Sequence, residues 1–321
     1  MENEVTVKSG QSQSSWEREA IEKLLLADTR ERRAVRRWRM FKSLVWMLLF
    51  AGLIWVLASD RLTTNTPSGP HTALVSIEGE IASKGDASAE YVLPAMRSAL
   101  EDPGSKALVL LINSPGGSPV QAGLINDEIR RLRKLHNKPI YAVVEETCAS
   151  AAYYIAAAAD RIYVDKASVV GSIGVLMDGF GFVGTMDKLG VERRLLTAGE
   201  NKGFLDPFSP QSEEQKKYAQ LMLDRIHQQF IAVVKKGRGD RLKETPETFS
   251  GLFWTGEQAV EMGLADDLGS LDSVARDVVK VEKLIDYSNK ENIAERLAKR
   301  FGAAAGQGAV SALRASLPSL R

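Results

Sequence analysis

The chain has 321 residues, of which 44% are hydrophobic and 26% are charged. This ordinary globular composition excludes a wholly disordered or collagen-like protein. The 42 Lys and Arg residues nearly balance the 41 Asp and Glu residues, so we expect no nucleic-acid partner. The single cysteine, Cys148, excludes an intrachain disulfide and a cysteine-cluster metal site. The 3 histidines are scattered without metal-ligand spacing, and we expect neither a metal nor a cofactor.

An uncharged apolar run, Ser43–Ser59, is the clearest feature near the N-terminus. As a helix it would be about 25 Å long, a little less than the ~30 Å hydrocarbon core of a bilayer. Trp46 and Trp55 lie near its ends, as interfacial anchors do. A core helix would show a polar face, and a signal peptide would begin closer to Met1. We therefore expect a permanent transmembrane helix over residues 43–59.

The charges that flank this run predict its orientation. The preceding segment, from Arg30 to Lys42, is rich in arginine and contains one acidic residue, whereas Asp60 and Arg61 follow the run. The positive-inside rule then places a tail of residues 1–42 in the cytoplasm and everything after the span across the membrane. A nucleic-acid-binding arm is the alternative, which the adjoining apolar run disfavours.

Beyond a linker of residues 60–72, apolar runs alternate with helical patterns. We expect strands at Ala73–Ile77, Lys106–Ile112, Pro139–Val144, Arg161–Val164 and Glu192–Thr197. We expect helices at Ala87–Leu100, Pro119–Leu135, Ser150–Ala159, Ser212–Lys236, Gly256–Met262 and Leu271–Val281. Strands that alternate with helices predict a mostly parallel sheet covered by helices, an α/β domain over residues 73–285. A basic extension, residues 286–321, follows it.

Two turns follow buried strands at places where chemistry can occur. The first, Asn113–Ser118, contains two glycines whose backbone N–H groups can bind an anion or an oxyanion. The second contains Ser150, at a strand-to-helix junction. Such a serine is often only a helix cap. The junction also suits a nucleophile, because the N–H of Ala151 would lie at a helix N-terminus that stabilises negative charge.

A serine nucleophile needs a base. The nearest histidine in sequence, His136, lies on the far side of a predicted strand. The alternative is a neutral lysine, which requires burial among apolar groups to lower its pKa. Lys202 precedes an apolar stretch rich in turn residues and is the candidate, although a loop lysine is usually a solvated surface group.

Taken together, these segments resemble the signal peptide peptidase A (SppA) family of membrane-bound serine proteases, over most of residues 73–280. The marks are the motifs at Ser114–Gly117, Ala149–Tyr154, Gly171–Val175, Gly199–Phe208, Trp254–Ala259 and Gly263–Asp266. Their order along the chain makes the resemblance far more specific than any one motif.

The resemblance implies a ClpP/crotonase-like α/β fold of repeated ββα units and a Ser-Lys dyad. It implies that Ser150 is the nucleophile, Lys202 the general base and Ser172 the hydroxyl that orients Lys202. Gly117 and Ala151 would supply the oxyanion-hole N–H groups. The family commonly has two glycines after the nucleophile, whereas this chain has Ala151 and Ala152. An alanine keeps its N–H, so the departure bears more on substrate range than on catalysis.

The sequence thus predicts a serine endopeptidase of the bacterial inner membrane, with its catalytic domain in the periplasm. Its substrates would be remnant signal peptides and other short apolar peptides. The glycine-rich apolar segment Gly179–Gly190 is typical of a surface that binds a partner, and related proteases form rings, so we expect a homo-oligomer, a tetramer or octamer. Two alternatives stay open, a crotonase-type acyl-CoA enzyme and a non-catalytic membrane scaffold.

Overall fold

The computed structural model describes residues 36–52 and 69–288. Contacts within the chain divide it into two units, Met1–Thr66 and Pro67–Arg321. Most of the expected cytoplasmic tail, the second half of the apolar run and nearly all of the C-terminal extension lie outside the described residues. The domain boundaries drawn from the sequence therefore stay predictions.

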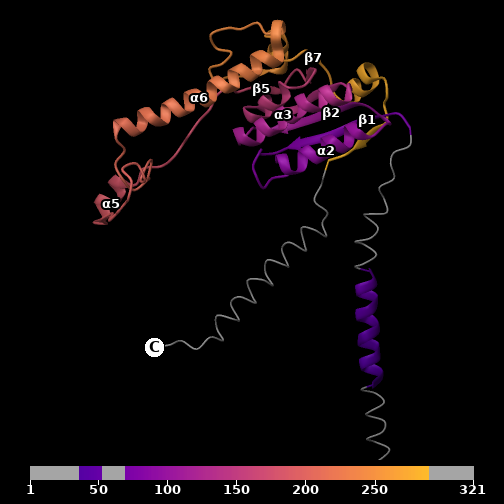
Figure 1. Ribbon diagram of the computed structural model, residues 1–321, viewed down its shortest axis with the longest axis horizontal. Helices are drawn as coiled ribbons and strands as arrows, with labels where there is room; N and C mark the ends of the chain where they lie inside the picture. Colours follow the sequence, from indigo (N-terminus) through magenta and orange to yellow (C-terminus); the bar gives the residue numbers. More distant parts are fainter. Residues whose placement is uncertain (1–35, 53–68, 289–321) are drawn as a thin grey trace, which may run out of the picture. The chain divides into compact units, whose positions relative to one another are not determined.

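In the first unit, residues 36–52 form one helix (Figure 1). Its apolar side chains are exposed, Trp46 to 71% and Phe50 to 63%. Within residues 36–52 and 69–288, no helix has both the length and the apolar character that crossing a membrane requires. The expected span over residues 43–59 runs past residue 52, out of the described part of the chain, and stays a prediction.

In the second unit, the described residues build one sheet in the order β6-β5-β3-β2-β1-β8, with β4 pairing with β3 and β7. The strands are β1 (His71–Glu78), β2 (Ser105–Ser114), β3 (Ile140–Ala149), β4 (Arg161–Val164), β5 (Val169–Gly171), β6 (Phe253–Thr255), β7 (Asp267–Leu268) and β8 (Leu284–Asp286). Every pairing is parallel except the antiparallel pair β5–β6. The predicted α/β architecture is confirmed at this level.

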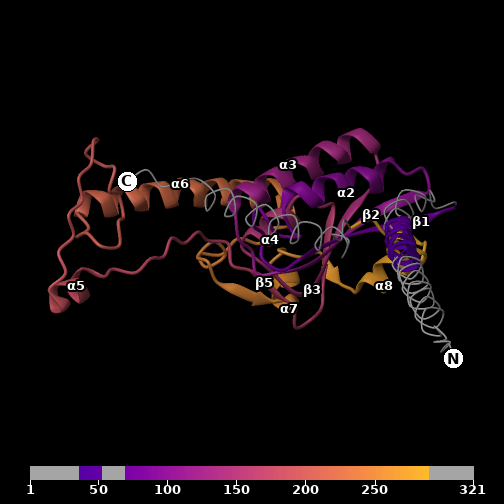
Figure 2. The same cartoon turned by 90° about the horizontal axis from the view of Figure 1, so that it is seen from below.

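Helices cover the sheet, and two of them, α2 and α3, lie side by side on one face (Figure 2). The helices are α2 (Ala89–Glu101), α3 (Pro119–His136), α4 (Ala151–Ala156), α5 (Val183–Leu189), α6 (Glu213–Arg238), α7 (Gly256–Glu261) and α8 (Leu271–Ser273). α3 begins where the sequence predicts, because the Ser118 hydroxyl accepts a hydrogen bond from the N–H of Gln121 and Pro119 has no N–H to satisfy.

Strand β2 shows why the sheet is buried on both faces. Its residues Leu108, Leu110 and Ile112 pack in the main core with α2, α3 and α4. Val109 and Leu111 point the other way, into a smaller cluster with Val143, Tyr163 and Val274. This is the arrangement that a continuously apolar run in a parallel sheet predicts.

Two predicted elements differ from the structure. Residues 192–197 form no strand: they are exposed, Leu196 to 96%, and pair with no strand in the described chain. A strand without a neighbour leaves its backbone groups unpaired, and this segment has three charged residues beside Leu195 and Leu196 and no buried residue that would bring it to the sheet. The helix expected over Leu271–Val281 is α-helical only as far as Ser273 and continues as a π-helix, Val274–Val279.

A long excursion, residues 175–211, connects β5 to α6, and we call it the arm. α5 lies in the arm at the end of α6 remote from the sheet (Figure 1). Within the arm, the N–H of Phe182 donates to the carbonyl of Pro207 and the rings of Phe182 and Phe208 stack, whereas Phe204 of the arm contacts Tyr218 of α6. No side chain of α5 is buried. The apolar residues of the arm are therefore left facing solvent in a single chain.

Candidate active site

Ser150 lies in a strained turn between β3 and α4. Its backbone has φ 54° and ψ −123°, a conformation that a residue with a Cβ rarely adopts. The turn is fixed by the Ser150 N–H, which donates to the Gly171 carbonyl at 2.8 Å. Although Ser150 occupies the helix-cap position, its side chain makes no capping hydrogen bond. Strain of roughly 1–3 kcal/mol at a residue that does not cap its helix points to a functional site.

The glycine turn that follows β2 lies against Ser150. A Cβ on Gly116 would come within 2.7 Å of the Ser150 Cβ, closer than real Cβ atoms approach one another. A Cβ on Gly117 would lie 2.3 Å from the Ile81 carbonyl oxygen. Both glycines have positive φ, 105° and 141°. Glycine is thus needed here so that the turn can approach Ser150.

Two backbone N–H groups beside Ser150 have no backbone acceptor among the described residues. The Ile81 N–H donates to the Gly116 carbonyl, and the Ile81 carbonyl accepts a hydrogen bond from the Ser118 N–H. The N–H of Gly117, which lies between these two residues, takes part in neither bond. The N–H of Ala151 is in the first turn of α4, where no carbonyl of the helix can accept it. Two such donors are what an oxyanion hole requires.

Ser172 reaches the same place through the sheet register. β3 and β5 pair in parallel so that Ala149 lies opposite Gly171, and each strand is followed by a serine. Ser172 also has positive φ, 50°, and its N–H donates to the Leu252 carbonyl at 2.8 Å. The two strained serines therefore follow neighbouring strands at one edge of the sheet.

A cavity of about 510 Å³ joins these groups. It brings together four of the five residues predicted for the site, Gly117, Ser150, Ala151 and Ser172. Three further lining residues come from α6, Ile226, Gln229 and Phe230. Sequence reasoning missed them, since only the packing of α6 on α4, where the Phe230 and Tyr154 rings lie 5.1 Å apart, brings them to the cavity.

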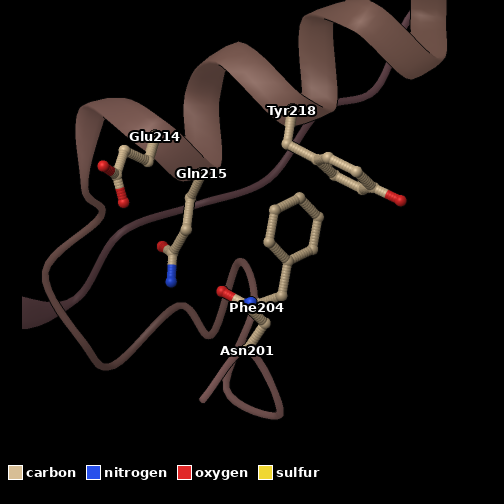
Figure 3. Close-up of a pocket in the computed structure, with 5 residues that line it drawn as sticks. All are labelled: Asn201, Phe204, Glu214, Gln215 and Tyr218. Carbon is tan, nitrogen blue, oxygen red and sulfur yellow. The ribbon is translucent and has the colours of Figure 1, made fainter.

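The fifth residue, Lys202, does not line this cavity within one chain. Its loop contacts the beginning of α6, where the Phe204 and Tyr218 rings meet edge to face at 5.7 Å (Figure 3). The cavity instead meets α6 between Ile226 and Phe230. From Tyr218 to Ile226 is roughly 12 Å along the helix axis at about 1.5 Å per residue, farther than a lysine side chain extends.

Among the described residues, no histidine, cysteine or lysine lines the cavity, and the Ser250 hydroxyl at its wall donates to the Glu247 carbonyl at 2.7 Å. His136 is the last residue of α3, whereas the only residue of that helix that lines the cavity is the first, Pro119. His136 therefore lies at the other end of the helix from the cavity. His227 shares a hydrogen bond of 3.0 Å with the Ile173 carbonyl through Nε2 and does not line the cavity. Cys148 is buried, and burial raises the pKa of its thiol, so it stays protonated. The described residues contain no His, Cys, Asp and Glu group suited to a metal ion.

Sequence comparisons show the family to which the chain belongs. The model of peptidase family S49 matches residues 133–285, which include Ser150, Ser172 and Lys202. A "Putative signal peptide peptidase SppA" of Enterococcus faecium is 32% identical over 240 residues, covering 71% of this chain and 70% of that protein. This chain belongs to the SppA family, peptidase family S49. A protease of Methanocaldococcus jannaschii, also named as putative, is 33% identical over 214 residues, 67% of each protein.

Other relatives of this S49 chain are longer proteins. A Brucella abortus protein named "Na(+)/H(+) antiporter NhaA" is 45% identical over 181 residues, 56% of this chain. The match covers only 25% of that protein, so this chain spans about a quarter of its length. The printed name describes the Brucella protein as a whole and is not transferred to the matched part.

Proposed function

We propose that this S49 chain is a membrane-anchored serine endopeptidase that cleaves remnant signal peptides and other short apolar peptides. The observation that carries the proposal is the strained Ser150 beside two N–H donors in one cavity, Gly117 and Ala151. As part of the same proposal we expect a ClpP/crotonase-like fold of repeated ββα units, with which a mostly parallel sheet covered by helices is compatible.

The proposed mechanism is acyl transfer. Neutral Lys202 takes the Ser150 hydroxyl proton as Oγ attacks the peptide carbonyl, and the N–H groups of Gly117 and Ala151 donate to the oxyanion. Lys202 returns the proton to the leaving amine as the C–N bond breaks, leaving an acyl ester on Ser150. Water then hydrolyses the ester with Lys202 again as the base. Ser172 accepts a hydrogen bond from the lysine amine and orients its lone pair.

We propose further that Lys202 acts on Ser150 of a neighbouring copy in a homo-oligomer, a tetramer or octamer. Lys202 is exposed in the single chain and its loop lies at the far end of α6 from the cavity. The arm exposes large apolar side chains that a second copy would bury, among them Phe180 at 79% and Leu196 at 96%. A ring of identical contacts would supply every serine with a lysine.

The cavity lining fits an apolar peptide. Its wall is formed largely by apolar side chains, Val175, Leu176, Ile226 and Phe230, with the half-buried Tyr154. Such a lining favours hydrophobic residues of an extended substrate. The apolar run over residues 43–59 and the arginines before it support an anchor in the inner membrane with the catalytic domain in the periplasm.

The test uses a fluorophosphonate probe and a mixing experiment on the full chain. The probe should label Ser150 in the wild type and not in Ser150→Ala. Ser150→Ala and Lys202→Ala should each be inactive, and their co-assembled mixture should regain part of the peptidase activity. Ser150→Ala mixed with Lys188→Ala is the control, because Lys188 is an exposed lysine of the same arm. The Lys188→Ala chains keep both Ser150 and Lys202, so this mixture should show the activity that these chains already have and no gain on co-assembly.

The outcomes separate the alternatives. A labelled Ser150 with no complementation in proven mixed oligomers would place the dyad within one chain. No label under any condition would favour a scaffold or the acyl-CoA enzyme. The acyl-CoA alternative already lacks support from the cavity, where no Asp or Glu is among the described lining residues.

A further inference from the structure

A second cavity, of about 560 Å³, lies at the opposite end of the sheet from Ser150. It is formed where α3 and α6 end and β3 begins, and we call it the basic pocket. The charged residues that line it are Arg130, Arg133, Lys134, Lys138, Lys236 and Asp160. Five cations thus surround one carboxylate.

The single carboxylate is already fully engaged. Asp160 Oδ1 accepts a hydrogen bond from Arg133 Nη2, and Oδ2 accepts one from the backbone N–H of Ile140 at 2.8 Å. Lys138 donates to the Leu100 and Asp102 carbonyls, both at 2.7 Å. Among the described residues, Lys134 and Lys236 form no ion pair with any carboxylate. The pocket therefore carries positive charge that the described chain does not neutralise.

Arg130 is the most informative of these side chains. Its Nε donates to Asn126 Oδ1 at 2.8 Å, and Asn126 is itself fixed by donating to the Tyr154 carbonyl at 2.7 Å. With the guanidinium held in this way, Nη2 is buried and has no hydrogen-bond partner in the described part of the chain. A buried donor without an acceptor is costly, roughly 1–3 kcal/mol and more for a charged group. Such an atom in a cationic pocket marks the place of a missing acceptor.

Burial, followed by the proximity of Arg133, lowers the pKa of the Arg130 guanidinium. Asp127 acts in the opposite direction but forms no ion pair with Arg130 in the described chain. The last carbonyls of α3 also face this end and attract cations, so part of the charge serves the helix. Arg133 and the exposed Lys134 lie in the last turn of α3, and Lys236 lies in the last turn of α6, so each also suits its own helix end. Arg130 lies before the last turn of α3, so this role does not account for it.

We propose that the basic pocket binds a phosphate group, with Arg130 Nη2 donating to a phosphate oxygen and Lys134 and Lys236 balancing its charge. A phosphate ester carries about −1.5 to −2 charge at neutral pH and several strong acceptor oxygens, which matches a surplus of cations around an unpartnered donor. The phosphate belongs either to a small soluble ester or to the headgroup of an anionic lipid, and the chemistry of recognition is the same. This site is independent of the peptidase chemistry proposed above.

The experiment measures phosphate binding by the full chain in neutral detergent at low salt. Calorimetric titration with inorganic phosphate and with glycerol 3-phosphate tests soluble esters. Titration of the chain with nanodiscs of phosphatidylcholine, with and without phosphatidylglycerol, tests lipid headgroups. We expect saturable binding, with a Kd near or below about 1 mM, in at least one of these titrations. Binding of glycerol 3-phosphate or inorganic phosphate identifies a soluble phosphate compound as the ligand. Binding only to nanodiscs that contain phosphatidylglycerol identifies a lipid headgroup.

Three variants assign the binding to this pocket. Arg130→Gln should weaken it about tenfold, because a charge-assisted hydrogen bond is lost. Lys236→Gln should weaken it about threefold, as an exposed charge contributes less. Lys235→Gln is the matched control, since Lys235 is the preceding residue of α6, pairs with Glu244 and does not line the pocket. It should bind like the wild type.

The proposal is overturned if neither soluble phosphate nor phosphatidylglycerol binds saturably. It is also overturned if Lys235→Gln weakens binding as much as Lys236→Gln, because the effect would then be general surface charge. Should Arg130→Gln fail to fold, as a thermal unfolding scan would show, the exposed Lys236 decides the matter against its control.

Discussion

The two halves of the proposed dyad lie in regions of opposite character. Around Ser150, the neighbours Cys148, Ala151, Ala152 and Tyr153 are all buried, and β3 has strands on both sides. Around Lys202, the arm has no buried residue in its helix α5 and exposes its large apolar side chains. The nucleophile side is complete within one chain, whereas the arm presents the kind of surface that a partner buries.

This difference assigns separate tasks to the two regions. Ser150 and Ser172 are fixed because their N–H groups donate to the Gly171 and Leu252 carbonyls. Gly117 is fixed between two neighbours that each form a hydrogen bond with Ile81, and none of these bonds needs a second copy. The arm continues from β5 at one end and from α6 at the other, and Phe204 packs on Tyr218 of α6. In the proposed oligomer, the position of Lys202 would depend on contacts that a single chain does not contain. Substitutions in the sheet region should therefore act on each site directly, and substitutions in the arm should act through assembly.

The largest effect is expected from Lys202 itself. Lys202→Ala and Lys202→Arg should each lower kcat/KM for a peptide substrate by at least about 10³-fold, because arginine stays charged and cannot serve as the base. Thermal unfolding should not change, since the side chain is exposed. Lys188→Ala serves as the control. Substantial activity in Lys202→Ala, with normal unfolding, would refute the dyad and direct attention to His136 and His227.

The second largest loss of activity is expected from a substitution in the glycine turn beside Ser150. Gly116→Ala should lower kcat by about 10²-fold or more, since the new Cβ would lie 2.7 Å from the Ser150 Cβ and displace the turn that carries the Gly117 N–H. Gly123→Ala is the control, because a Cβ there meets nothing within 4 Å, and alanine in helix α3 should stabilise the fold slightly. Equal activities of the two variants in a peptidase assay would show that the turn takes no part in catalysis.

How far the sequence predicts this site depends on the range of the interactions. β2, α3 and the Ser150 junction follow from local patterns, namely a doubly apolar run, a cap followed by proline, and a serine between a strand and a helix. The proximity of Ser172 needed the sheet register, which the resemblance to the SppA family supplied indirectly. Phe230 and Ile226 carry no local signal of this kind, because α6 buries few of its residues and its packing on α4 is tertiary.

The false strand at residues 192–197 has the same origin. Two adjacent leucines that follow charged residues are compatible with a strand in a sheet and with a segment that a partner covers, and the two cases differ only in what lies opposite the leucines. Leu195 and Leu196 are exposed in the single chain, so the fold of one copy does not explain these two apolar side chains. That makes the run a sensitive place to test whether the arm is an interface.

Leu196→Asp should weaken the assembly of the chain and thereby lower its peptidase activity about tenfold. A charge at a side chain that is 96% exposed costs the isolated chain little, but desolvating it in an interface is unfavourable. We expect native mass measurement to show smaller species and peptidase activity to fall about tenfold at fixed protein concentration. Leu135→Asp, at an exposed leucine of α3 in the sheet region, should change neither. Intact oligomers in Leu196→Asp would exclude this run from the interface.

The smallest expected effect is on the pH dependence of stability, and it is tested with one glutamate from each region, Glu128 and Glu192. Hydrogen bonds from Arg131, opposed by burial and reinforced by Arg97, lower the pKa of Glu128 to about 2. Because this pKa lies below its ordinary value of 4.5, the carboxylate stabilises the fold above about pH 4.5, and that contribution is lost as the pH falls toward 2. Both arginines are about half exposed, so solvent screening reduces the loss to about 1 kcal/mol.

Urea unfolding between pH 6 and pH 3 measures this contribution. Glu128→Gln should flatten the acid branch of the stability curve, since its amide does not titrate. Glu192→Gln should leave the curve unchanged, because the Glu192–Arg194 pair of the arm is 71% and 83% exposed and contributes little. If the two variants gave the same acid branch, the electrostatic difference between the sheet region and the arm would be absent, and only their apolar contacts would distinguish them.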